Sequence, residues 1–297
     1  MNIKKATQYK LLFFLIVGVC FSIKIYCQNN ISQEIKFASY LTKKKLYNEA
    51  IFVLKSQKEI TINNIQQDSI FYNLGINYAL IDSKELSNIN FLKISTTNKN
   101  LQNNAALNIG YNFMQLKNYD SAASYITKIN ENDVDSNIAD LKNYFLSCNA
   151  LLIRDTAKFA YFNKKINSQA DFFKNSVTQN KLLYKKIISR KQKSAFLAGL
   201  FSTILPGAGK LYAGKTGEAL GTLVPLATLG FLALEAYKNG GISTVPFWGF
   251  STLFSIFYLG NIWGSTLSVN IAQTQFNKSI NNEININMQF PINSFLR

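Results

Sequence analysis

The stretch LPGAGKLYAGKTGEALG, residues 205–221, contains residue types that could bind a phosphate group. Within it, Gly209, Gly214, Lys215 and Thr216 satisfy the pattern G-x-x-x-x-G-K-[ST] of a phosphate-binding loop. Such a loop needs a buried strand before it, a helix after it and an acid on a second strand to hold Mg²⁺. The residues after Thr216 contain no aspartate and form long apolar runs. We therefore expect no nucleotide partner.

Other residues that commonly carry catalysis are scarce. The chain has no histidine, which removes the commonest general base and the commonest metal ligand. Its three cysteines are Cys20, Cys27 and Cys148, and their spacing fits no zinc site. We expect no catalytic residue, no cofactor and no bound metal, so the chain is not predicted to be an enzyme.

The chain is strongly basic, with 32 Lys and Arg against 16 Asp and Glu. Clustered cations can bind nucleic acid. However, Lys, Asn, Ile, Tyr and Phe are all abundant together, a combination expected from AT-rich codons. Part of the charge therefore reflects composition, and no nucleic-acid partner is expected.

Residues 1–27 have the pattern of a secretory signal peptide. Lys4, Lys5 and Lys10 precede an apolar run over 11–23, which is short for a membrane span and suits a signal sequence. Cleavage after Cys27 would leave Gln28 first. An uncleaved signal anchor is the alternative. In both cases the chain that follows is expected to be exported.

Residues 31–165 are predicted to be helical and self-similar. Apolar residues recur at helical spacing, and the small residues Ala38, Gly75 and Gly110 occupy equivalent positions, 37 and 35 residues apart. A weaker fourth unit runs over 138–162. The stretches LGINY and IGYNF carry a further resemblance: this region resembles the tetratricopeptide repeat, a helix-turn-helix unit of 34 residues.

The resemblance implies a helical solenoid whose small residues lie where paired helices touch. A plain helical bundle is the alternative. Stacked repeats bury a shared core and leave a concave face, so the implied partner is a protein or peptide.

Residues 166–193 are predicted to form a basic amphipathic helix that connects the repeats to an apolar C-terminal part. It ends in a cluster of six cations, which we expect to contact anionic lipid headgroups: Lys181, Lys185, Lys186, Arg190, Lys191 and Lys193.

Residues 194–272 are predicted to form a membrane domain. A half-helix over 195–205 ends before Pro206, and two apolar runs over 219–237 and 245–271 are long enough to span a bilayer. A polar tail with a possible short strand follows, over 273–297.

The motif P-G-x-G-x-x-Y-x-G begins at Pro206. It is similar to the turn motif of small bacterial membrane domains that are joined to exported repeat regions. The resemblance implies a membrane module in which Gly207, Gly209 and Gly214 permit a tight turn and Tyr212 lies at headgroup level.

Two G-x-x-x-G pairs lie in the apolar runs: Gly217 with Gly221, and Gly260 with Gly264. If the break at Gly240-Gly241 is the hairpin turn, these pairs face each other at equal depth and allow the helices to pack closely. The alternative is that glycine is simply common in membrane helices.

The sequence thus predicts an all-α protein of a bacterial membrane: a tetratricopeptide-like solenoid, facing the periplasm or exterior, followed by a transmembrane hairpin. The expected function is a scaffold or adaptor, and the membrane part could mediate homo-oligomerisation. The alternative is an accessory factor for transport or membrane insertion, whose pore-lining candidates would be Glu235, Asn261 and Lys210. The basic cluster conflicts with an exported solenoid, because positive charge tends to stay in the cytoplasm.

Overall fold

The computed structural model describes residues 31–58, 64–95, 98–131, 134, 136–167 and 171–295. All regular structure in these ranges is helical, which confirms the predicted all-α class. The predicted signal peptide lies outside the described residues. The chain divides into two compact units, an N-terminal unit up to Ala170 and a C-terminal unit from Asp171.

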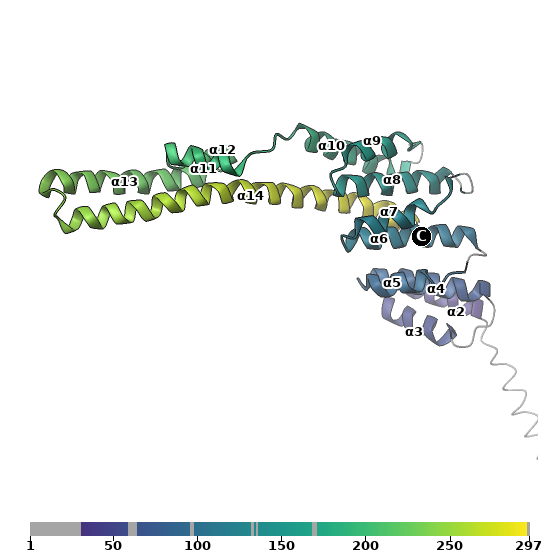
Figure 1. Ribbon diagram of the computed structural model, residues 1–297. Coiled ribbons are helices and arrows are strands. Elements are labelled where there is room, and N and C mark those ends of the chain that lie inside the picture. Colours follow the sequence, from purple (N-terminus) through teal and green to yellow (C-terminus); the bar gives the residue numbers. More distant parts are fainter. Residues whose placement is uncertain are drawn as a thin grey trace, which may run out of the picture. The chain divides into compact units, whose positions relative to one another are not determined.

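The described part of the N-terminal unit consists of four helical hairpins (Figure 1). The helices of each hairpin are consecutive in the chain: α2 (Ile31–Lys43) with α3 (Tyr47–Lys58), α4 (Asn64–Leu80) with α5 (Lys84–Phe91), α6 (Lys99–Gln115) with α7 (Tyr119–Thr127), and α8 (Ser136–Leu152) with α9 (Thr156–Lys164). Each hairpin also packs against the next, because α3 contacts α4, α5 contacts α6, and α7 contacts α8.

The turns inside the four hairpins share one backbone geometry. Each contains a non-glycine residue in the left-handed region, with φ between 60° and 65°: Lys45, Asp82, Lys117 and Arg154. In each turn the next residue donates its N–H to the carbonyl five positions earlier, as Ser83 does to Tyr78 at 2.9 Å. This bond belongs to the Schellman motif that ends many helices. The sequence repeat is therefore also a repeat of backbone conformation, and it includes the fourth hairpin.

Small residues lie where the helices of a hairpin meet, as predicted. A Cβ added to Gly75 would lie 2.6 Å from the Phe91 ring, and one added to Gly110 would lie 2.3 Å from Ile126. The equivalent Ala38 is fully buried. A larger side chain at Gly75 or Gly110 would therefore displace a core side chain of the partner helix.

Buried asparagines join successive hairpins, a feature that the sequence analysis missed. They are 35 and 37 residues apart and at most 5% exposed: Asn77, Asn112 and Asn149. Each bonds to the preceding hairpin: Asn77 to the Thr42 hydroxyl at 2.9 Å, Asn112 to the Ser87 hydroxyl at 2.9 Å, and Asn149 to the Tyr119 carbonyl at 3.1 Å. Because a buried amide is costly without partners, these bonds favour one register between hairpins.

The C-terminal unit contains a long helical hairpin. Its arms are α13 (Thr216–Gly240) and α14 (Val245–Phe295), which lie side by side (Figure 1). The chain turns after Gly240, at the predicted break, and Gly241 has a φ of 73° that favours glycine. We call residues 241–244 the tip of this hairpin and the level of Thr216 and Ala272 its base.

The possible short strand in the polar tail is not found, because residues 273–295 continue α14 as helix. Ile280, Ile284 and Met288 recur every four residues and are at most 2% exposed. Each spacing of four residues places them on one helical face, which packs against α10 (Asp171–Ser189). This four-residue spacing is present in the sequence, but the many asparagines around it make the segment as a whole polar, so the apolar face was not predicted.

Helix α10 runs antiparallel to this part of α14. Asn180 accepts a hydrogen bond from Asn287 at 2.8 Å, and Lys186 pairs with Glu283 at 3.4 Å. Nearer the base, the Arg190 guanidinium lies 3.8 Å from the centre of the Phe276 ring. The two helices thus form a pair that continues the hairpin beyond its base.

Candidate functional site

The residues of the phosphate-loop pattern lie in a helical turn. Short helix α12 (Ala208–Ala213) precedes α13, and the described part of the chain provides no strand before it. The N–H of Gly209 donates to the Ser202 hydroxyl at 2.9 Å, so it is not free to bind a phosphate. Lys215 pairs instead with Glu218 at 3.5 Å. The geometry therefore differs from that of a nucleotide-binding loop.

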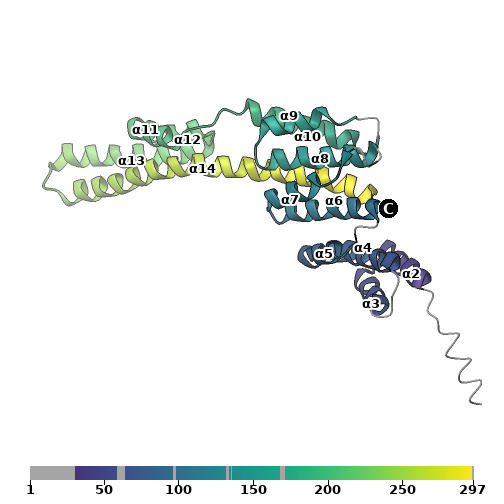
Figure 2. The same cartoon turned by 45° about the vertical axis from the view of Figure 1, so that its right-hand side comes forward.

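The motif at Pro206 reverses the chain between two short helices. Helix α11 (Ala195–Ile204) ends at Leu205, whose extended backbone (φ −136°, ψ 116°) is the conformation that a following proline favours. Gly207 and Gly214 have φ of 86° and 87°, which only glycine adopts readily. The chain therefore enters along α11, turns at Pro206 and Gly207, and returns along α12 to the base (Figure 2).

Three buried side chains satisfy the backbone at this turn, and we call Ser202, Asn261 and Ser265 the turn-capping cluster. Asn261 accepts the Gly207 N–H at 3.1 Å and donates to the Ser202 carbonyl at 3.3 Å. The hydroxyls of Ser202 and Ser265 lie 2.7 Å apart. All three side chains are at most 3% exposed.

The turn-capping cluster explains how α11 can end among apolar helices. A helix end leaves backbone N–H and C=O groups without helical partners, and such groups are costly away from water. Here, α14 supplies the missing partners, because the Tyr258 hydroxyl also donates to the Thr203 carbonyl. The turn and α14 therefore depend on each other.

Two motif glycines lie at very close backbone contacts. A Cβ on Gly209 would lie 1.9 Å from the Ala198 carbonyl oxygen, and one on Gly207 would lie 2.7 Å from that of Ala219. Atoms cannot approach so closely. Both positions therefore require glycine, which supports the predicted tight turn.

The other predicted glycine contacts are corrected. A Cβ on Gly217, Gly221 or Gly260 would meet no heavy atom within 4 Å, and one on Gly264 would only touch the Lys210 side chain at 3.7 Å. The two G-x-x-x-G pairs therefore do not bring α13 and α14 together. The close backbone contacts lie instead between α11 and α12, at Gly209 and Ala198, and between the turn and α13, at Gly207 and Ala219.

Tyr212 links the two ends of the short-helix segment at the base. Its hydroxyl accepts the Ser194 N–H at 3.1 Å, and its ring meets that of Phe201 edge-on with centres 5.2 Å apart. The Lys193 ammonium lies 5.7 Å from the same ring centre.

The cluster of six cations is not one uniform surface. Arg190 covers Phe276 and donates to the Ala272 carbonyl at 3.2 Å, while Lys186 pairs with Glu283. The other four members are exposed to solvent: Lys181, Lys185, Lys191 and Lys193.

Comparison with known proteins gives no further assignment. No protein family, curated protein or solved structure matches the chain. The function is therefore inferred from the chain's own residues.

Few of the described side chains are arranged for metal binding or for lining a pore. No cluster of three potential metal-binding side chains occurs among the described residues. Of the three pore candidates, Asn261 belongs to the turn-capping cluster, and Lys210 donates to the Thr222 hydroxyl at 2.6 Å. Glu235 is exposed near the tip.

Proposed function

We propose that the chain is a membrane-anchored scaffold or adaptor, in which the N-terminal unit binds a protein or peptide and the C-terminal unit inserts in a membrane. The observation that carries the first half is the repetition of turn geometry and of bridging asparagines through four hairpins. Such repetition supports a tetratricopeptide-like solenoid, and solenoids act mainly as binding surfaces.

The first hairpin offers an apolar docking groove. Phe37 on α2 is 49% exposed and Phe52 on α3 is 76% exposed. Both line a groove of 460 Å³ together with Leu41, Glu49 and Val53. Exposed aromatic side chains around a groove favour a partner segment that brings apolar side chains of its own.

The apolar side chains of α13 and α14 are mostly exposed on the surface of the C-terminal unit. Helix α13 has 25 residues, or about 37 Å at 1.5 Å per residue, which exceeds the roughly 30 Å core of a bilayer. Only 11% of its most apolar window is buried, and 6% of that of α14. A core helix of a soluble protein would be mostly buried. These helices are therefore better suited to lipid.

The six cations of the basic cluster lie at different distances from the proposed membrane surface. We place the base-side boundary of the membrane at Ala272, where the apolar run ends and Arg190 binds. Glu283, the partner of Lys186, lies eleven residues farther along α14 (283 − 272), or about 16 Å. The headgroup layer is only about 5–8 Å thick. Arg190, Lys191 and Lys193 are therefore placed to contact anionic headgroups, whereas Lys186 and the residues before it project beyond them.

We propose that the N-terminal unit faces the periplasm or exterior of a bacterium, because the signal peptide predicts export. A reporter fusion near residue 175 tests this orientation. Periplasmic reporter activity is expected, and cytoplasmic activity would show that the basic residues determine the topology instead.

Partner binding is tested by a photo-cross-linking amino acid placed at Phe52 in the full chain in its native membrane. A discrete cross-linked species is expected, and it should disappear when Phe37 is replaced by Lys. Exposed Asn100, in another hairpin, is the control position. Identical products from positions 52 and 100, or none from position 52, would count against the groove as a binding site.

A further inference from the structure

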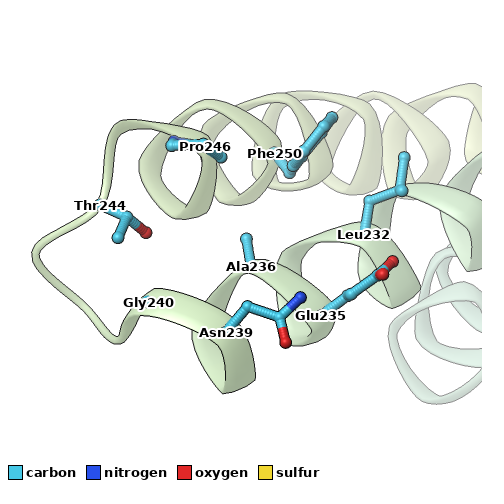
Figure 3. Close-up of a pocket in the computed structure, with 8 residues that line it drawn as sticks. All are labelled: Leu232, Glu235, Ala236, Asn239, Gly240, Thr244, Pro246 and Phe250. Carbon is cyan, nitrogen blue, oxygen red and sulfur yellow. The ribbon is translucent and has the colours of Figure 1, made fainter.

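The tip of the long hairpin contains a pocket of 340 Å³ (Figure 3). Its walls come from both arms. Leu232, Glu235 and Asn239 contribute from α13, and Pro246 and Phe250 from α14. The lining is thus mainly apolar, and its polar side chains are the Glu235 carboxylate, the Asn239 amide and the Thr244 hydroxyl, which donates to the Gly241 carbonyl at 3.0 Å.

Glu235 differs from Glu218 and Glu283, the two other acids after residue 194. Glu218 accepts a hydrogen bond from Ser268 at 3.2 Å and pairs with Lys215, and Glu283 pairs with Lys186. Glu235 has neither a hydrogen bond nor an ion pair with any residue in the described part of the chain. Its carboxylate therefore remains available to a ligand.

Glu235 also lies at a defined depth. It precedes the end of α13 at Gly240 by five residues, or about 7.5 Å along the helix axis. In a membrane crossed by α13, this level is close to the boundary between hydrocarbon and headgroups. A carboxylate in that position is costly unless a cation reaches it, so it indicates function.

The surroundings of the carboxylate favour a cation of a particular kind. The pocket lies at the C-terminal end of α13, where the helix dipole is negative, and the Phe250 ring can contribute a cation–π contact. One carboxylate, one amide and one hydroxyl offer only four side-chain oxygens, too few for a metal such as Ca²⁺, which takes six to eight. An ammonium group needs only a few acceptors.

We propose that the tip pocket binds the primary ammonium group of a zwitterionic lipid headgroup, that of phosphatidylethanolamine. Three N–H bonds allow this group to donate to both Glu235 and Asn239. The quaternary ammonium of phosphatidylcholine has no N–H to donate. The inference rests on the proposed insertion of α13 and α14 in a membrane.

Tryptophan fluorescence tests the proposal, because the chain has two tryptophans and Trp248 lies on the first turn of α14, between Pro246 and Phe250. The full chain with Trp263→Phe is reconstituted in phosphatidylcholine vesicles that contain a minor fraction of brominated phosphatidylethanolamine or brominated phosphatidylcholine. Bromine quenches nearby tryptophan. We expect the ethanolamine lipid to be enriched about threefold near Trp248, as modest exposed ion pairs allow.

Glu235→Gln should make the two brominated lipids quench equally, and Asn239→Leu should weaken the preference. Glu283→Gln, which removes an acid on the other side of the base, should leave it unchanged. Equal quenching by both lipids in the parent chain, or a preference that survives Glu235→Gln, would overturn the proposal. Insertion is measured separately by flotation with pure phosphatidylcholine vesicles and by resistance to alkaline extraction. Failure there would refute the proposed membrane anchoring instead.

Discussion

Replacement of Gly209 by Ala should loosen the buried turn of the C-terminal unit. The new Cβ would lie 1.9 Å from the Ala198 carbonyl oxygen, whereas ordinary contact begins at 3.4 Å, so α11 and α12 must separate by about 1.5 Å. That movement breaks the Gly209 bond to Ser202 and strains the Ser202–Ser265 bond. Two weakened bonds cost about 2 kcal/mol and overpacking about 1–3 kcal/mol, offset by about 1 kcal/mol from removing a helical glycine. The expected net loss is about 2–4 kcal/mol.

Gly221→Ala is the matched control, because its Cβ would meet nothing within 4 Å. This change should stabilise α13 by about 0.5–1 kcal/mol. Both tryptophans lie in α14, so their fluorescence during denaturant unfolding in micelles reports the C-terminal unit alone. Equal shifts for the two variants would refute the inferred close contact at Gly209.

Four further outcomes are expected. Lys215→Ala should not affect nucleotide binding, because no binding is expected; protection of the parent chain from heat by ATP would contradict this. Burial raises the pKa of Tyr72 to about 12, although a hydrogen bond with Asn108 acts in the opposite direction. The folded unit therefore holds this proton more tightly than the unfolded chain, so stability is complete below pH 10 and falls by about 2–3 kcal/mol as the pH approaches 12. Tyr72→Phe should flatten this dependence in urea unfolding at pH 9 and pH 11.5, and an unchanged slope would exclude Tyr72 as its source. Asn112→Ala should cost the N-terminal unit about 2 kcal/mol in the same assay, whereas exposed Asn100→Ala should cost almost nothing. A fragment of residues 31–170 should be soluble and helical by circular dichroism, and an insoluble or unfolded product would show that the two units are not separable.

The sequence predicted those features that depend on local spacing. Helical periodicity predicted the hairpins, and the small residues at Gly75 and Gly110 predicted where their helices touch. Pro206 and Gly207 predicted the reversal of the chain, because proline restricts its own backbone and glycine permits a positive φ, whatever the rest of the fold.

Long-range features were not predictable in the same way. Asn261 lies more than fifty residues after Gly207, and no periodicity links an amide to the turn that it caps. The glycine pairs show the opposite error. The small-residue pattern at Gly221 and Gly260 permits close packing but does not require it. By contrast, the bridging asparagines could have been found, because Asn77 and Asn112 repeat at the same interval as Gly75 and Gly110.

The reversal at Pro206 also determines the parity of the membrane crossings. Helices α11 and α12 enter and leave at the base, so they add no crossing, whereas α13 and α14 together add two. An even number returns the chain to the side from which it came. If the hairpin spans a bilayer, α10 and the last residues of α14 share one compartment, and a tag after Arg297 reports the same side as a fusion near residue 175. Disagreement between the two reporters would mean that the short-helix segment crosses the membrane as well.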